Sequence, residues 1–137
     1  VTRKISLAAA RIKKGLQKKL KLGNIKSKRD WGHAKDYVEA MWLMLQQDNP
    51  GDYVIGTGEE NSVEDFAKKA FNHVGLNYKD YIILDENLVR PSEVDNLLAD
   101  STKAKKILKW KPKISFDDLV ISMVEHDLEQ IENKNYF

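Results

Sequence analysis

The residues with the clearest chemical potential are cations at the ends of predicted elements or in loops. They are Arg3, Lys4, Arg29 and Arg90, and an acid, Glu93, follows Arg90 by three positions. Arginine presents a planar fork to phosphate oxygens and lysine a compact point charge. These groups would suit a diphosphate, with Glu93 accepting hydrogen bonds from ribose hydroxyls. Spacing alone leaves a simpler interpretation open, in which each side chain is a solvated surface charge.

Charge is distributed unevenly along the chain. Residues 1–29 hold eleven of the 23 lysines and arginines and none of the 21 acids, so this segment carries +11, although the whole chain carries only +2. A basic block of this kind is either the solvated face of a helix or an anion-binding surface. The charge pattern does not choose between the two.

Other sites for chemistry find little support in the sequence. Gly56-Thr57-Gly58 lies between a predicted strand and a predicted helix, but the third glycine of a dinucleotide-binding loop is replaced by Asn61. A plain strand-to-helix turn is therefore favoured over a cofactor loop. The histidines, His33, His73 and His126, are far apart and have no second metal ligand at helical spacing.

Nucleophilic and redox motifs are also missing. The chain has no cysteine, no Gly-x-Ser-x-Gly sequence, and no tyrosine followed four residues later by lysine. We therefore predict no catalytic, cofactor-binding or metal-binding residue in this chain.

Apolar periodicity and capping residues predict a helix-rich fold with a few short strands. A Ser-x-x-Asp pattern starts one helix at Ser62, which Gly75 ends, and another caps the final helix at Ser115. The other predicted helices cover 2–19, 33–47 and 102–108, and the predicted strands cover 21–23, 53–55 and 81–84.

The stretch from Leu22 to Asp36 is predicted to organise the chain. It passes from a strand through a basic turn into a helix, and we expect it to hold an anionic ligand at that junction. The helix that follows is apolar nearly all round, with Met41 to Leu45 consecutive. Such a helix is expected to be covered on more than one side.

Size and composition fit one soluble domain over residues 1–137. The hydrophobic fraction is 42% and the charged fraction 32%, which is ordinary for a globular protein. No apolar run is long enough for a membrane span, and the lack of cysteine suits the cytoplasm. A start at Val1, inside a predicted helix, leads us to expect a fragment of a longer protein.

Several runs of sequence strongly resemble the GDP-mannose 4,6-dehydratase family of extended short-chain dehydrogenases. The most specific is Arg-Asp-Trp-Gly-His-Ala-Lys-Asp-Tyr-Val over residues 29–38. The other matching runs extend in order through the chain and cover residues 1–5, 22–24, 41–47, 53–55, 57–59, 90–95, 103–104 and 110–112.

The resemblance implies an α/β fold class. The chain would be the helix-rich, C-terminal substrate-binding portion of such an enzyme, with the N-terminal Rossmann part absent. The family reaction converts GDP-mannose into GDP-4-keto-6-deoxymannose and water by an internal NADP-dependent redox cycle, which makes the parent enzyme a lyase of GDP-fucose biosynthesis. The glycine-rich NADP loop and the catalytic residues would lie in the absent part. We therefore expect the fragment alone to bind no NADP and to be inactive.

The resemblance also suggests roles for individual residues. Lys4 and Arg29 would contact the diphosphate and nucleotide, and Arg90 would be a second phosphate contact. Glu93 would bind the ribose. The wall of the guanine pocket would include Leu22, Gly23 and Asn24.

The chain departs from the family pattern near two of these positions. Lys109 stands where the family usually has a glycine that ends a short helix with positive φ, so that cap is expected to differ. Leu88-Val89 replaces the usual Tyr-Phe before Arg90, which affects the expected shape of the pocket there.

Partners follow from these interpretations. We expect GDP-mannose and the missing Rossmann half as partners, with no membrane partner, and a homo-oligomer is an open alternative. The competing hypothesis is a stand-alone basic module that binds nucleic acid or another polyanion through residues 1–29. Trp31 and Trp42 lie outside that segment, so stacking residues are not interleaved with its charges, and nucleic acid is the less favoured partner.

Overall fold

The computed structural model describes residues 1–89, 92 and 94–133. The chain divides into two compact units. Unit 1 contains residues 1–27, 62–95 and 120–137, and unit 2 contains residues 28–61 and 96–119. The elements are α1 (Thr2–Lys13), β1 (Leu20–Leu22), β2 (Lys28–Arg29), α2 (Ala34–Leu45), β3 (Asn61–Ser62), α3 (Val63–His73), η1 (Tyr78–Asp80), β4 (Ile82–Leu84), η2 (Glu86–Leu88), β5 (Asn96–Leu97), α4 (Thr102–Ile107) and α5 (Phe116–Glu132).

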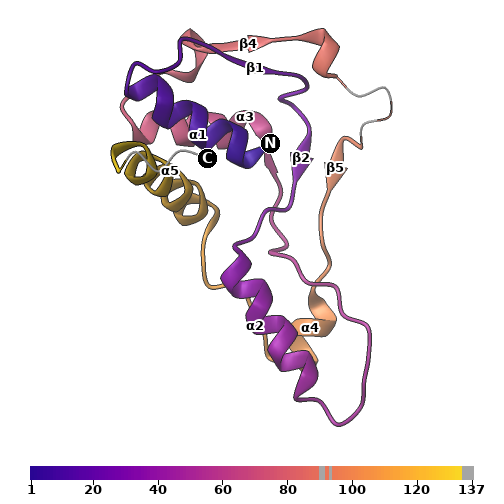
Figure 1. The fold of residues 1–137 in the computed structure, drawn as a ribbon. Coiled ribbons are helices and arrows are strands. Elements are labelled where there is room, and N and C mark those ends of the chain that lie inside the picture. The colour runs from indigo at the N-terminus through magenta and orange to yellow at the C-terminus, as the bar shows by residue number, and fades with distance from the viewer. Residues whose placement is uncertain (90–91, 93, 134–137) are drawn as a thin grey trace. The chain divides into compact units, whose positions relative to one another are not determined.

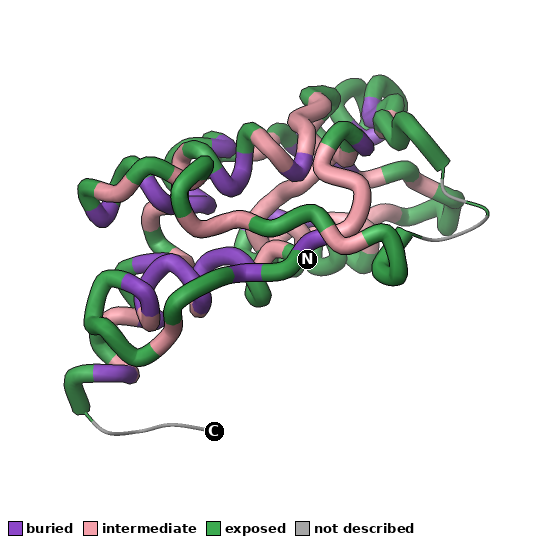
Figure 2. The backbone as a smooth tube through the Cα atoms, turned by 90° about the horizontal axis from the view of Figure 1, so that it is seen from above, coloured by how far each residue is buried: buried purple, intermediate pink, exposed green. Residues whose placement is uncertain are grey.

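Unit 1 is built from α1, α3 and the greater part of α5, with β1 and β4 paired in parallel (Figure 1). Leu20 lies opposite Ile82 and Leu22 opposite Leu84. Each helix contributes one apolar side to the core, so buried and exposed residues alternate along the helices (Figure 2). The largest buried apolar side chains of this unit include Phe66, Phe71, Ile5, Val120 and Val124.

The first helix is shorter than the sequence pattern predicts. We expected it to continue to residue 19, but α1 ends at Lys13. Gly15 has φ +72°, its N–H donates to the Ile12 carbonyl at 3.0 Å, and the Leu16 N–H donates to Arg11 at 2.8 Å. These two bonds form a Schellman motif, which ends a helix by satisfying its last carbonyls.

Unit 2 has a small core between α2 and α4. Ala40 on α2 packs with Ala104, Leu108 and Trp110, and the partly buried side chains around them are Tyr37, Leu43, Met44, Tyr53 and Ile55. The short strands β2 and β5 run parallel, with Lys28 opposite Asn96 and Arg29 opposite Leu97, in a sheet of order β3-β2-β5.

Apart from the early end of α1, most predicted elements are confirmed, but the strand predicted at 53–55 is not. The strand predicted at 81–84 is β4, and the capping box at Ser62 is present, with Ser62 Oγ accepting from the Asp65 N–H at 3.0 Å. The buried strand predicted at 53–55 is wrong, because no strand is assigned there and Val54 is 55% exposed. A strand is stable only when its backbone groups are paired, and no described residue pairs with this segment as a strand.

No helix in the described part of the chain is both long and apolar enough to cross a membrane.

Candidate functional site

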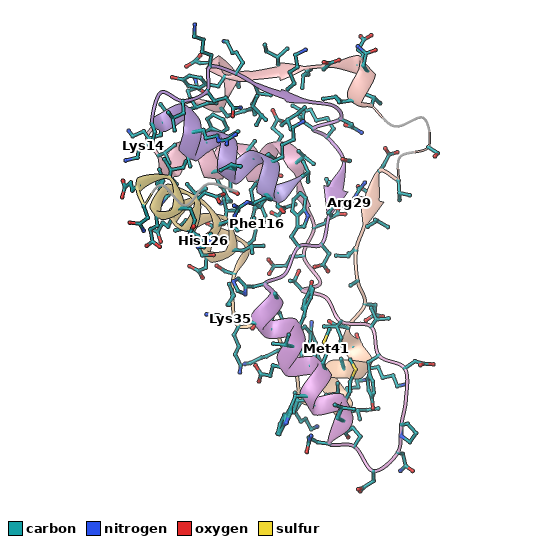
Figure 3. All side chains as sticks on the ribbon, in the orientation of Figure 1. Lys14, Arg29, Lys35, Met41, Phe116 and His126 are labelled. Atoms are coloured by element: carbon teal, nitrogen blue, oxygen red, sulfur yellow. The ribbon has the colours of Figure 1, made fainter. Side chains whose placement is uncertain are left out.

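Arg29 is the predicted ligand residue that the structure places beside a cavity. It lies at the end of β2 next to β5 (Figure 3), half-buried, and its Nη1 donates to the Lys28 carbonyl at 2.7 Å. The cavity has a volume of about 360 Å³ and is lined by Arg29, Asp30, Trp31, Leu97, Leu98 and Ala99. This volume is within the range of small-molecule pockets, so the cavity could hold part of a nucleotide sugar.

Asp30 fixes the shape of that cavity. Its Oδ1 accepts from the Thr57 N–H at 2.9 Å and the Thr57 hydroxyl at 2.6 Å, and its Oδ2 accepts from the N–H groups of Gly58 at 2.9 Å and Ala99 at 3.3 Å. Burial alone would raise the pKa of Asp30, but these hydrogen bonds favour the carboxylate and together lower its pKa. One carboxylate thus connects β2, the 57–58 turn and the segment after β5.

The same bonds explain the Gly-Thr-Gly sequence without a cofactor. A Cβ on Gly56 would lie 2.3 Å from the Ala99 Cβ, and Gly58 has φ +79°. The N–H groups of Thr57 and Gly58 point at Asp30, so they are not directed at a ligand phosphate as in a dinucleotide-binding loop. The turn therefore does not fit NADP, and we derive no step through that cofactor.

Trp31 lies between two cavities of unit 2. It lines the cavity beside Arg29, and its ring stacks on Phe116 with centroids 6.0 Å apart and planes inclined by 11°. The second cavity, of about 230 Å³, is lined by Trp31, Thr57, Glu59, Asn61 and residues 112–116. Trp31 thus contributes an aromatic wall to both spaces.

Asp36 is a structural residue of the specific 29–38 run. It is buried, and its Oδ2 accepts from the N–H groups of Lys113 and Ile114, each at 3.0 Å. Its backbone carbonyl accepts from Trp110 Nε1 at 2.8 Å. Asp36 therefore holds the connection after α4 against the start of α2.

Tyr37 packs closely against Gly32, since a Cβ on Gly32 would lie 2.6 Å from the Tyr37 hydroxyl oxygen. Burial raises the pKa of Tyr37, and the negative charge of Asp30 raises it further. The phenol of Tyr37 therefore stays neutral. The close packing of Tyr37 also explains why residue 32 is a glycine.

The predicted guanine-wall residues lie in unit 1. Leu22 is buried in β1, and a Cβ on Gly23 would lie 2.5 Å from the Leu88 carbonyl oxygen, so only glycine permits this approach. Asn24 Oδ1 accepts from the Lys26 N–H at 2.9 Å. The segment thus lies against Leu88, two residues before Arg90.

The remaining predicted ligand residues are Lys4, Arg90 and Glu93. Lys4 is exposed on α1 and, within the described part of the chain, makes no hydrogen bond or ion pair with Leu22, Gly23 or Asn24. Arg90 and Glu93 lie outside the described residues. The roles of all seven residues in ligand binding stay predictions.

At least five of the eleven basic residues of the 1–29 segment pair with acids from later in the chain. The pairs are Arg3 with Asp127, Lys14 with Glu132, Lys21 with Asp85, Lys26 with Glu64 and Lys28 with Glu60. Glu64 also accepts from the Tyr78 hydroxyl at 2.8 Å, and the hydrogen bonds from Lys26 and Tyr78 lower its pKa. The +11 segment is therefore less electropositive in the folded chain than in the sequence.

Two histidines have structural roles. His33 is the N-cap of α2, with Nδ1 accepting from the Lys35 N–H at 3.1 Å, and His73 lies 3.4 Å from Glu125. Among the residues that the structure describes, no group of three histidine or acidic side chains could hold a metal ion.

Sequence reasoning missed Asp30, Trp31 and Leu97–Ala99 as cavity residues. Asp30 and Trp31 directly follow Arg29 in the most specific run, which was the available signal. No pattern in the sequence around residues 97–99 indicates that they line the cavity, because their position there depends on the pairing of β5 with β2.

Comparison with solved structures shows the fold. The RMD protein from Pseudomonas aeruginosa, solved in complex with NADPH, matches with a TM-score of 0.85 at 20% identity, over 94% of this chain and 42% of that one. This confirms the predicted fold class, an α/β fold that is helix-rich and has few short strands.

Sequence comparison shows the family. The family model described as GDP-mannose 4,6 dehydratase matches residues 1–123. GDP-mannose 4,6 dehydratase 1 from Arabidopsis thaliana is 58% identical over 94% of this chain and 36% of its own length, and the Homo sapiens enzyme is 49% identical over 94% and 39%. The chain thus spans well under half the length of these relatives. It belongs to the GDP-mannose 4,6-dehydratase family.

Proposed function

We propose that this chain is the substrate-binding part of a GDP-mannose 4,6-dehydratase and holds the nucleotide portion of GDP-mannose. The observation that carries the proposal is the position of Arg29 beside a cavity of about 360 Å³, in a chain whose relatives are named GDP-mannose 4,6 dehydratases. A guanidinium at a strand end can bind phosphate oxygens with two parallel hydrogen bonds.

The chain's own residues would bind and orient the substrate. Arg29 would offset one of the two negative charges of the diphosphate, and Asp30 would keep the cavity wall in place through Thr57 and Ala99. In the overall reaction GDP-mannose loses one water and becomes GDP-4-keto-6-deoxymannose. We assign no proton transfer or redox step of that reaction to the described residues, and we expect no turnover by this chain alone.

The other expectations rest on the same proposal. NADP use by the complete enzyme, the place in GDP-fucose biosynthesis and the cytoplasmic location stay predictions, as does a single binding domain over residues 1–137. The competing polyanion-binding hypothesis predicts a strong salt dependence, and the ion pairs of the basic segment reduce the charge available for it.

The test is calorimetric titration of the chain with GDP-mannose, UDP-glucose and a short DNA duplex at two salt concentrations. We expect guanine-selective binding that Arg29→Ala weakens by about 10- to 100-fold, since a charged hydrogen bond contributes roughly 1–3 kcal/mol. Arg90→Ala is expected to act in the same direction.

Lys28→Ala is the matched control. It removes an equal charge from the neighbouring residue of β2, where side chains alternate between faces, and its exposed pair with Glu60 contributes little to stability. An equal effect of Arg29→Ala and Lys28→Ala, or salt-sensitive binding of DNA alone, would contradict the proposal.

A further inference from the structure

Helix α2 exposes a row of large apolar side chains. Val38, Met41, Trp42 and Leu45 are 58%, 59%, 60% and 83% exposed. Their spacing of three and four residues places them on one side of the helix, which we call the α2 stripe. Single exposed apolar residues are ordinary, but a continuous row of four marks an interaction surface.

The α2 stripe is not the side of the helix that forms the core of unit 2. Ala40 is fully buried, and Tyr37, Leu43 and Met44 pack with it against Ala104, Leu108 and Trp110. The helix therefore has two apolar sides, of which unit 2 covers one. The sequence expectation that α2 is covered on more than one side is not met within unit 2.

A second feature of unit 2 also lacks its complement. Tyr53 and Ile55 pack against the core while Val54 is 55% exposed, which is the alternation typical of a strand. No strand in the described part of the chain pairs with residues 53–55. An apolar segment with unpaired backbone groups is a site where another strand can add.

The core of unit 2 is small for the apolar surface that surrounds it. Six of its apolar residues are buried, namely Ala40, Ala104, Leu108, Trp110, Phe116 and Leu119. Eight large ones are exposed, namely Val38, Met41, Trp42, Leu45, Val54, Leu97, Leu98 and Ile107. Domains of about 60 residues are marginal even when most of their apolar surface is buried, so unit 2 needs further cover.

The relatives indicate what provides this cover. The chain spans 36% of the Arabidopsis thaliana enzyme and 42% of the solved Pseudomonas aeruginosa chain. In these proteins more than half of the polypeptide accompanies the part that this chain matches.

We propose that the α2 stripe and residues 53–55 form a docking surface for the portion of a GDP-mannose 4,6-dehydratase that this chain does not span. That portion would bring an apolar face to α2 and a strand to residues 53–55. The inference rests on the proposed function as part of a larger dehydratase.

The test compares one double substitution in two contexts. This chain replaces the matched region of Arabidopsis thaliana GDP-mannose 4,6 dehydratase 1, and Met41→Glu/Trp42→Glu is made both in this chimera and in the chain by itself. Because both side chains are exposed in the chain by itself, its melting temperature should change by less than about 2 °C, whereas that of the chimera should fall by about 5 °C or more.

Lys18→Glu is the matched control, because it also changes the net charge by −2 at an exposed position, and it lies in unit 1, outside α2 and residues 53–55. It should leave both melting temperatures within about 2 °C of the parent values. Equal shifts for the double substitution in the two contexts would overturn the proposal.

A second copy of the chain is the competing occupant. If the chain alone sediments as a dimer that Met41→Glu/Trp42→Glu converts to a monomer, the α2 stripe binds another copy and the proposal is wrong. No GDP-mannose is present in these measurements, so a failure of nucleotide-sugar binding in the earlier titration would leave their outcome unaffected. Conversely, GDP-mannose binding together with equal shifts would reject only the docking surface.

Discussion

Lys109 has φ +53° and is the only non-glycine residue with positive φ among those that the structure describes. It follows Leu108, the buried C-cap of α4, and precedes the buried Trp110. The expectation that lysine would alter this cap is wrong, because the backbone keeps the left-handed conformation in spite of the side chain. Burial on both sides of Lys109 over-determines its conformation.

Lys109→Gly should raise the free energy of unfolding by about 1 kcal/mol, because glycine adopts positive φ without the steric cost of a Cβ. The measurement is denaturant unfolding. Lys106→Gly is the control within α4, where glycine should instead lower the free energy by about 1 kcal/mol. Changes of the same sign at both positions would show that strain at Lys109 is not the cause.

Asp30→Asn should lower the free energy of unfolding by about 2–3 kcal/mol, because an amide cannot accept from all four donors that surround the carboxylate. Thr57→Val removes only the hydroxyl and should cost about 1 kcal/mol. An Asp30→Asn variant as stable as the parent would show that the carboxylate does not hold the cavity wall.

The effect of Asp30→Asn on the free energy of unfolding should depend on pH. The pKa of Asp30 is lower in the folded chain than the ordinary value of 3.8, so its stabilising contribution is complete above that value. The contribution is lost as the pH falls through the lower folded pKa. The difference in unfolding free energy between parent and Asp30→Asn should therefore be constant near neutral pH and shrink in acid, and a difference that grew in acid would contradict the assignment.

The sequence could indicate Arg29 as a ligand residue but not the role of its neighbour. Arg29 has a recognisable chemistry at the end of a predicted strand. The donors to Asp30 lie 27 and 69 residues away, and no local pattern reports contacts at such separations. The sequence could therefore predict the cation beside the cavity, Arg29, but not the residues that form the cavity wall.

At the scale of elements, the capping box of α3 is the clearest link between sequence and structure. Ser62 accepts from the Asp65 N–H, Asp65 accepts from the Ser62 N–H, each at 3.0 Å, and the hydrogen bond from the Ser62 hydroxyl lowers the pKa of Asp65. Ser62→Ala should lower the free energy of unfolding by about 1 kcal/mol. Ser62→Thr keeps the hydroxyl and should cost less, as chemical denaturation would show; equal losses would exclude the cap as the cause.

Elements with local signals were predictable, and elements that depend on distant partners were not. The caps at Ser62 and Ser115 lie within three residues of their partners, so the sequence contains the whole interaction. Gly15 was also a local signal for the end of α1, but the apolar spacing of Leu16 and Leu20 outweighed it. Residues 53–55 have the composition of a strand, whereas pairing requires another segment.

At the scale of the whole chain, a buried acid joins the N-terminal helix to the C-terminal helix. Asp127 is fully buried, its Oδ1 lies 2.6 Å from Arg3 Nη1, and its Oδ2 accepts from the Ser6 hydroxyl at 2.6 Å. Arg3, a candidate phosphate ligand in the sequence, is thus engaged within unit 1. Loss of one partner from a buried ion pair is destabilising because the remaining charge stays buried.

Arg3→Ala should therefore lower the free energy of unfolding by about 2 kcal/mol, less than for a fully buried pair because the arginine is half exposed. Lys4→Ala, next to it on the exposed side of α1, should change stability by less than about 0.5 kcal/mol. Thermal and denaturant unfolding would measure both, and a larger loss for Lys4→Ala would reject the role of the pair.

The order in which the chain contributes to its units has a consequence for synthesis. Unit 1 takes residues from the start, the middle and the end of the chain, and unit 2 takes the two stretches between them. The hydrogen bond from the Ser6 hydroxyl to Asp127 can form only after 121 further residues have been translated. Domains commonly fold in turn as they leave the ribosome, but unit 1 cannot close until most of α5 has been translated, whereas unit 2 needs the chain only as far as Leu119. Unit 2 can therefore close before unit 1 during synthesis, although unit 1 begins earlier in the chain.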